Sequence, residues 1–182
     1  QGAAGLGQRH PVPVAIDQFG VGQVPDNLLN GPLARPRPAA ELRSLGKFQL
    51  LNQVGSGAFG AVWRAHDMEL ERIVALKILH ASLLSVPVNR ERFYREARAA
   101  AQLRHHGIVA VFEVKELEGL PTIVSEFVEG MTLREFLGVR RLSFRESAEL
   151  VALVADALDY AHGMGLVHRD VKPANIMIVN PR

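Results

Sequence analysis

The pattern of apolar and polar positions from residue 48 onward predicts mainly short strands in the first half of the chain. Strand-like runs, rich in β-branched and aromatic residues and separated by turn residues, cover 48–54, 61–65, 73–79, 108–115 and 121–127. One helix is predicted between the third and fourth runs, because apolar residues recur at helical spacing within 89–104. The pattern therefore predicts a five-stranded sheet with one inserted helix.

After these strands the apolar residues change to helical spacing. A brief helix is predicted at 132–137, followed by a longer one that begins at Ser143, which forms a capping box with Glu146. Gly163 is a natural C-terminal stop for the longer helix, and the apolar residues at 176–179 predict a short strand. This order of elements predicts an α+β fold in which a small β lobe precedes a helical lobe.

Residues 1–46 lack any lasting periodicity. Pro32, Pro36 and Pro38 lie close together, with arginines interspersed among them. We expect a mostly disordered leader or linker here, with a basic tether to a partner as the alternative. The predicted organisation is thus a linker at 1–46, a β lobe at 47–128 and a partial helical lobe at 129–182.

Composition narrows the class of protein. The 182 residues suffice for one domain, and 48% hydrophobic with 22% charged residues is the balance of a soluble globular protein. A net charge of +2 gives no reason to expect a nucleic-acid partner. The absence of cysteine excludes disulfides and thiolate metal sites, and fits a cytoplasmic location. No apolar run is long enough to span a membrane, and the initial Gln1 suggests a piece of a longer protein, whose remainder could hold a membrane anchor.

The loop between the long helix and the last strand carries a dense set of polar side chains. Its sequence is His168-Arg169-Asp170-Val171-Lys172-Pro173-Ala174-Asn175, and we call it the 168–175 loop. Asp170 can accept a proton from a hydroxyl, Lys172 can neutralise a phosphate, and the amide oxygen of Asn175 suits a hard cation such as Mg²⁺. Pro173 fixes its own φ and favours a rigid loop. A polar surface turn is the alternative.

A glycine-rich stretch joins the first two predicted strands. It reads Gly55-Ser56-Gly57-Ala58-Phe59-Gly60, with Val62 two residues later. Glycines allow backbone N–H groups to approach phosphate oxygens closely. A dinucleotide-binding unit would continue into a helix, whereas here a strand follows. A phosphate-binding hairpin is therefore favoured over a Rossmann loop, and a plain hairpin turn is the remaining alternative.

Lys77 lies in a nearly all-apolar predicted strand. A buried lysine without a partner is costly, so we expect either an ammonium that reaches solvent or a paired carboxylate. Glu96 is the obvious partner, because it shares the predicted inward face of its helix with Phe93 and Ala97. The pair would let Lys77 hold phosphate groups.

Together these residues resemble the protein kinase family, and the D-x-K-P-x-N run most resembles bacterial serine/threonine protein kinases of eukaryotic type. The resemblance covers residues 48–179. It implies a bilobal fold, with a five-stranded antiparallel N-lobe and an incomplete helical C-lobe in this chain. It also implies ATP and Mg²⁺ as cofactors, and protein substrates that carry Ser or Thr.

The resemblance assigns a role to each polar residue. Asp170 orients or deprotonates the hydroxyl, Lys172 stabilises the moving phosphoryl group, and Asn175 holds Mg²⁺. Lys77 grips the α- and β-phosphates and pairs with Glu96. The nucleotide would further contact the glycine-rich loop, an adenine roof and floor, and backbone groups of the inter-lobe connector: Val54, Gly55, Ser56, Gly57, Ala58, Phe59, Gly60, Val62, Ala75, Glu126, Val128 and Met177.

One part of the family pattern has no counterpart after the last predicted strand. The resemblance implies an Asp-Phe-Gly motif shortly beyond 176–179, where its Asp binds metal, and the sequence reaches Arg182 without it. We therefore expect these 182 residues alone to transfer phosphate poorly. Two alternatives stay open: a non-catalytic kinase-like module, and a small-molecule phosphotransferase of the aminoglycoside or choline type.

The dipeptide His105-His106 resembles a metal-binding pair. Adjacent side chains on a loop rarely converge on one ion, and the sequence offers no evident third ligand. A structural turn is therefore the interpretation we favour.

Overall fold

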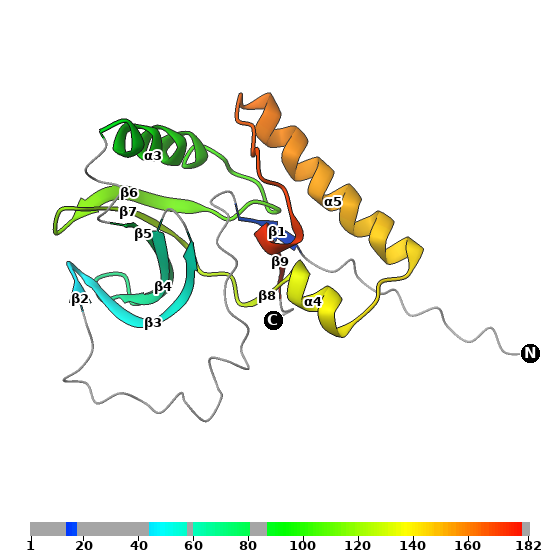
Figure 1. The fold of residues 1–182 in the computed structure, drawn as a ribbon, viewed down its shortest axis with the longest axis horizontal. Helices are drawn as coiled ribbons and strands as arrows, with labels where there is room; N and C mark the ends of the chain where they lie inside the picture. The colour runs from blue at the N-terminus through cyan, green and yellow to red at the C-terminus, as the bar shows by residue number, and fades with distance from the viewer. Residues whose placement is uncertain (1–13, 18–43, 58–59, 81–86, 180–182) are drawn as a thin grey trace, which may run out of the picture.

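The computed structural model describes residues 14–17, 44–57, 60–80 and 87–179. Figure 1 shows a strongly curved sheet with one helix, α3, along its side, and a second part built around the helices α4 and α5. Among the described helices, none combines the length and the apolar character needed to cross a membrane.

The N-lobe is one antiparallel sheet in the order β2-β3-β4-β5-β7-β6. Its strands are β2 (Ser44–Leu45), β3 (Phe48–Gly57), β4 (Gly60–Asp67), β5 (Arg72–Leu79), β6 (Val111–Leu117) and β7 (Leu120–Glu126). The five predicted strands are confirmed, although the fourth begins at Val111 rather than at residue 108, and β2 adds a short edge strand to them. Phe48, Val74, Leu76 and Val124 are buried together on the sheet.

Helix α3 (Pro87–Ala100) packs on this sheet, although it ends four residues earlier than predicted. Ala97 and Ala100 are buried against Val111 of β6 and Ile123 of β7. The N–H groups of residues 102 and 103 donate to carbonyls three residues back, so the chain leaves the helix through a tighter turn. The turn directs the buried Leu103 into the C-lobe core.

The C-lobe contains a small antiparallel sheet in the order β1-β9-β8. Its strands are β1 (Val14–Ile16), β8 (Gly130–Thr132) and β9 (Ile176–Val179). Their apolar side chains form a core with residues of α5 (Phe144–Gly163) and of α4 (Leu133–Val139). The predicted strand at 176–179 and the predicted helix after residue 132 are thereby confirmed.

Both C-lobe helices start with reciprocal side-chain caps. The Ser143 hydroxyl accepts the N–H of Glu146, and the Glu146 carboxylate accepts the N–H of Ser143. Thr132 and Glu135 make the same arrangement at the start of α4. Helix α5 ends at Gly163, as predicted. The Ser143 cap fixes where α5 begins, and the helix ends at Gly163, so the chain segment that leads to the 168–175 loop starts at Met164.

Strand β1 corrects the expectation of a linker at 1–46. Val14, Ala15 and Ile16 are buried, and Ile16 exchanges backbone hydrogen bonds with Gly107 and Val109 as well as pairing with Ile176. Burial of this triplet is favourable because β9 and the segment at 107–109 provide both hydrogen-bond partners for its backbone and apolar contacts for its side chains. The linker prediction is wrong for 14–16 and for β2, while residues 1–13 and 18–43 lie outside the described part.

Candidate functional site

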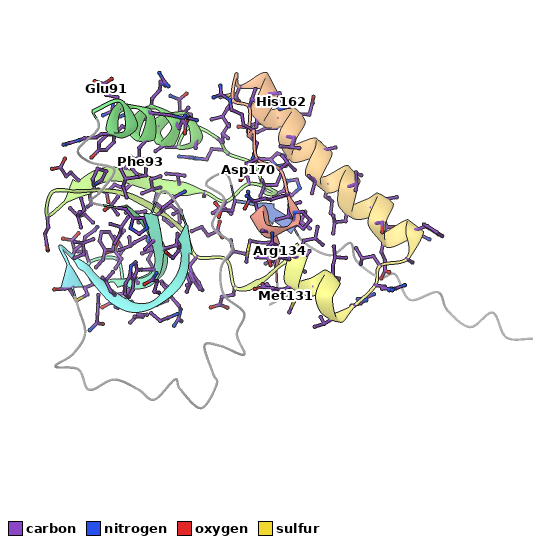
Figure 2. All side chains as sticks on the ribbon, viewed as in Figure 1. Glu91, Phe93, Met131, Arg134, His162 and Asp170 are labelled. Carbon is purple, nitrogen blue, oxygen red and sulfur yellow. The ribbon has the colours of Figure 1, made fainter. Side chains whose placement is uncertain are left out.

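The 168–175 loop connects α5 to β9, and Figure 2 shows Asp170 on this connection. Arg169 adopts the left-handed region, with φ of 65°. This backbone conformation is unfavourable for a long side chain and is found mostly where surrounding contacts enforce it. The loop then closes in a single 3-10 turn, η2 (Pro173–Asn175), so that Asp170, Lys172 and Asn175 point into one small region.

Asp170 is the centre of the hydrogen bonds in this region. Lys172 Nζ donates to Asp170 Oδ2 at 2.6 Å, and Asn175 Nδ2 donates to the same oxygen at 3.1 Å. The hydrogen bond from Lys172 lowers the pKa of Asp170, and that from Asn175 lowers it further. Asp170 is therefore a carboxylate at neutral pH. Lys172 and Asp170 are both about half-exposed, so solvent can reach the pair.

His168 joins the loop to the end of β1. The Asp170 N–H donates to His168 Nδ1 at 3.2 Å, so the proton of a neutral imidazole lies on Nε2. Nε2 then donates to the backbone carbonyl of Asp17, 3.1 Å away. The Asp17 N–H in turn donates to the carbonyl of Asn175 at 2.9 Å. Asp17 is thereby held against the 168–175 loop through both of its backbone polar groups.

Lys77 projects from the middle of the N-lobe sheet, on β5, with Val62 of β4 and Ile123 of β7 as its register partners. Burial lowers the pKa of Lys77, while the negative charges of Asp17 and then Glu96 oppose that effect. The alternative of an ammonium that reaches solvent from an exposed edge does not apply, because β5 is an interior strand. Asp17 is thus a carboxylate close enough to act electrostatically on Lys77.

The expected inward position of Glu96 is wrong in this structure. Its side chain is 48% exposed and pairs with Arg92 Nε, one helical turn earlier, at 2.8 Å. Phe93, Ala97 and Ala100 do line the inward face of α3, and Glu96 lies at the edge of that stripe. A residue at the edge can turn either way, and here the guanidinium of Arg92 draws the carboxylate outward.

The residues expected around a nucleotide fall into two buried groups. Val54, Val62 and Ala75, the predicted roof, pack together in the N-lobe with Phe127 against them. Met177 and Val128 pack with Ala15 of β1 in a second cluster. Val128 was expected to contribute a backbone group, and its side chain in addition forms part of the cluster that holds the predicted floor.

The glycine-rich stretch belongs to the β3–β4 hairpin, and its tip, Ala58 and Phe59, lies outside the described residues. Gly57 pairs with Gly60, and Ser56 pairs with Ala61. A Cβ on Gly60 would lie 2.2 Å from the carbonyl oxygen of Ile78, so β4 and β5 approach too closely there for a side chain. In the connector, the Glu126 N–H already donates to Ala110, which leaves its carbonyl as the group it could offer.

The loop at 105–107 does acquire a third potential metal ligand, Asp156 of α5, which the sequence did not reveal. Ligand atoms of His105, His106 and Asp156 lie within 4.8 Å of one another. However, His105 Nδ1 accepts the Gly107 N–H, so Nε2 carries the proton that it shares with Asp156. His105 also stacks on Tyr160. These contacts support the interpretation of a structural turn.

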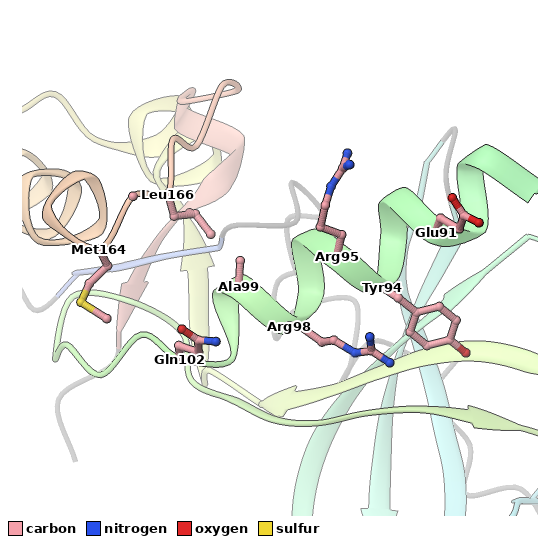
Figure 3. Close-up of a pocket in the computed structure, with 9 residues that line it drawn as sticks. Glu91, Tyr94, Arg95, Arg98, Ala99, Gln102, Met164 and Leu166 are labelled. Atoms are coloured by element: carbon pink, nitrogen blue, oxygen red, sulfur yellow. The ribbon is translucent and has the colours of Figure 1, made fainter.

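A cavity of about 630 Å³ lies between α3 and the segment after α5. Arg95 and Arg98 line one side of it, and Met164 and Leu166 line the other (Figure 3). None of the predicted site residues lines this cavity, so it is separate from the region around Asp170 and Lys77.

Asp17 is the residue that sequence reasoning missed. A signal was available, because the apolar triplet Val14-Ala15-Ile16 runs directly into Asp17, and Phe19-Gly20 follow one residue later. A buried strand followed by Asp-Gln-Phe-Gly is close to the expected Asp-Phe-Gly pattern, with Gln18 inserted after the Asp. The family resemblance implies this motif only after residues 176–179, whereas Asp17 precedes the whole N-lobe.

Comparison with known proteins gives consistent results. The family model described as "Protein kinase domain" matches residues 48–182. Serine/threonine-protein kinase PknF of Mycobacterium tuberculosis is 44% identical over 147 residues, which is 79% of this chain and 31% of PknF. The probable serine/threonine-protein kinase SCO3848 of Streptomyces coelicolor is 43% identical over 138 residues, which is 73% of this chain and 20% of that protein.

Solved structures agree with these sequence relatives. The crystal structure of the M. tuberculosis PknI kinase domain superposes with a TM-score of 0.68 at 31% identity, covering 80% of this chain and 59% of that one. The chain spans between a fifth and a third of the length of the curated relatives described above. With the bilobal architecture, the 168–175 loop and the family match in agreement, this chain belongs to the protein kinase family.

Proposed function

We propose that this chain binds ATP with Mg²⁺ and forms the nucleotide-binding and catalytic-loop part of a serine/threonine protein kinase that acts on protein hydroxyls. The observation that carries this proposal is the hydrogen-bonded group of Asp170, Lys172 and Asn175, with Lys77 held in the facing lobe. Membership of the protein kinase family, and relatives named serine/threonine kinases, support it.

In this proposal the adenine lies between the cluster of Val54, Val62 and Ala75 and the cluster that contains Met177. The backbones of Glu126 and Val128 bind its edge. The phosphates lie under the backbone of the glycine-rich stretch, and the Lys77 ammonium binds the α- and β-phosphates. A buried lysine whose pKa is lowered by desolvation gains strongly from such an anionic ligand, because the phosphates add negative charge beside its ammonium.

The chemical step transfers the γ-phosphoryl group. A Ser or Thr hydroxyl oxygen forms a bond to the γ-phosphorus, the bond to the ADP oxygen breaks, and the hydroxyl proton passes to Asp170. Because its pKa is lowered, Asp170 is a weak base and acts chiefly by orienting the hydroxyl. Lys172, which pairs with Asp170 here, would turn toward the phosphoryl group as negative charge gathers there.

The residues present fit Mg²⁺, a cation that prefers oxygen ligands. Asn175 is fully buried, and its Oδ1 has no hydrogen-bond partner among the residues described. Such an oxygen is available to a cation. Mg²⁺ would supply charge neutralisation for the phosphates at this position.

The proposal is tested first by nucleotide binding to the 182-residue chain. Titration of a fluorescent, non-hydrolysable ATP analogue in the presence of Mg²⁺ should show saturable binding. Lys77→Met should weaken it by about tenfold or more, because a charge-assisted contact to phosphate is lost. Lys115→Met, a matched change on β6 that leaves the site intact, should bind as the wild-type chain does.

Transfer experiments separate the alternatives. Radiolabelled ATP is offered with a serine-containing peptide, and separately with an aminoglycoside and with choline. The proposal expects label only on the peptide, at a low rate in these 182 residues, and none with Asp170→Asn. Label on a small molecule would favour a small-molecule phosphotransferase. Binding without any transfer would favour a non-catalytic module, and absence of nucleotide binding would refute the proposal.

A further inference from the structure

The end of β1 brings a carboxylate residue from the N-terminal segment beside the 168–175 loop. Ile16 pairs with Ile176, and the next residue, Asp17, is bound through its N–H to Asn175 and through its carbonyl to His168. These contacts fix the Asp17 backbone on the same side of the molecule as Asn175. The negative charge of Asp17 also acts on Lys77, so the carboxylate lies within electrostatic reach of the ammonium on β5.

Asn175 presents an unusual oxygen at this junction. Its Nδ2 donates to the Asp170 carbonyl at 2.7 Å and to Asp170 Oδ2 at 3.1 Å. Both neighbours are acceptors only, so the amide cannot be reversed, and Oδ1 must point away from them. Oδ1 is buried and lacks a hydrogen-bond partner among the residues described. A buried oxygen in that condition is costly unless a ligand compensates it.

We propose that the Asp17 carboxylate and Asn175 Oδ1 together bind the divalent cation that accompanies the nucleotide. This inference rests on the proposed function, since the cation would bridge protein and phosphates. The chain would thereby obtain, from a strand that precedes the whole N-lobe, the acidic metal ligand that the family resemblance implies only after β9. Pairing with Lys77 alone would account for the charge of Asp17 but would leave the buried oxygen of Asn175 without a partner.

The test uses Mn²⁺ as a paramagnetic probe, added to the full 182-residue chain with a non-hydrolysable ATP analogue. Bound Mn²⁺ is measured by electron paramagnetic resonance, and nucleotide binding is measured separately in EDTA. Asp17→Asn keeps the backbone hydrogen bonds and should weaken Mn²⁺ binding by at least about tenfold. Asp159→Asn, which removes an exposed carboxylate of α5, should leave Mn²⁺ binding unchanged. Circular dichroism verifies that both variants are folded.

A measurement on the unmodified chain tests the inference even if the Asp17→Asn variant fails to fold. Mn²⁺ should broaden the nuclear magnetic resonance signals of Asp17 and Asn175, and should spare those of His105, His106 and Asp156. Broadening confined to the histidine turn, or equal Mn²⁺ affinity in Asp17→Asn and wild type, would overturn the inference.

Failure of the inference is distinguishable from failure of the proposed function. If the chain binds nucleotide in EDTA but Mn²⁺ binding does not depend on Asp17, the metal assignment is wrong and nucleotide binding stands. An increase in metal-free nucleotide affinity in Asp17→Asn, with unchanged Mn²⁺ affinity, would show that Asp17 serves only as the counter-ion of Lys77. If no nucleotide binds under either condition, both proposals fall.

Discussion

Lys172 Nζ lies 2.6 Å from Asp170 Oδ2, so the carboxylate proposed to meet the substrate hydroxyl is paired with the loop's own ammonium. While no phosphate is bound, the opposite charges of Lys172 and Asp170 stabilise each other. The pair also sets the protonation behaviour of Asp170, and this can be measured directly.

We expect Lys172→Met to raise the pKa of Asp170 toward its ordinary value of 3.8, because the largest contribution to the lowering is the hydrogen bond from Lys172. The titration is followed by nuclear magnetic resonance of the Asp170 side-chain carboxyl carbon. Lys115→Met should leave the Asp170 titration unchanged. An unaltered titration in Lys172→Met would show that the ion pair does not persist in solution.

Asp67, at the end of β4, should make stability depend on pH. Its buried carboxylate accepts the N–H groups of Glu69 and Leu70 and pairs with Lys47, and its pKa is lowered although burial alone would raise it. A lowered folded-state pKa means that the stabilisation is present above the ordinary value of 3.8. It is lost as the pH falls through the folded-state value.

Asp67→Ala should therefore lower the free energy of unfolding by about 1–3 kcal/mol at neutral pH, because two backbone donors lose their acceptor. The loss relative to wild type should shrink at acid pH. Urea unfolding at several pH values measures both effects. Glu71→Ala, in the exposed turn after β4, is the control. An equal loss at every pH would contradict the assigned role of the Asp67 charge.

Gly130 of β8 should tolerate no side chain. A Cβ there would lie 2.0 Å from the carbonyl oxygen of Ile178, so Gly130→Ala must push β8 away from β9. We expect a loss of about 1–3 kcal/mol in thermal or urea unfolding. Gly138 has open space around its position in α4, and Gly138→Ala should instead stabilise the chain by about 0.5–1 kcal/mol. The opposite order of the two variants would refute the close packing of β8 on β9.

Ile16 tests whether β1 belongs to the folded core. It is 2% exposed and packs with residues of α5 and β9, so Ile16→Ala should cost about 2–5 kcal/mol in urea unfolding. Val139→Ala removes methyl groups from a residue that is 81% exposed and should change stability by less than about 0.5 kcal/mol. If the two variants are equally stable, β1 does not contribute to the core in solution.

Local patterns were sufficient to predict most of the fold between residues 48 and 179. The strands of the N-lobe, the capping box at Ser143 and the end of α5 at Gly163 depend on residues within a few positions of one another. Family membership followed from the order of residues in the 168–175 loop, which is also local.

Two features depended on contacts that a local pattern does not contain. Strand β1 is too short for its periodicity to be recognised, and its burial depends on β9, which lies near the other end of the sequence. The orientation of Glu96 depends on competition between Arg92 and the lobe interior. In both cases, the local structure depends on which partner elsewhere in the fold is available for contact.

The pairing of β1 with β9 has a consequence for how the protein is made. Strand β1 is synthesised before the whole N-lobe sheet, and its partner β9 is synthesised only after that sheet and α5. The strands of the N-lobe sheet are mostly neighbours along the chain. This sheet can therefore form while β1 is still unpaired. The small sheet beside the 168–175 loop should therefore form after the N-lobe sheet, once β9 has been synthesised.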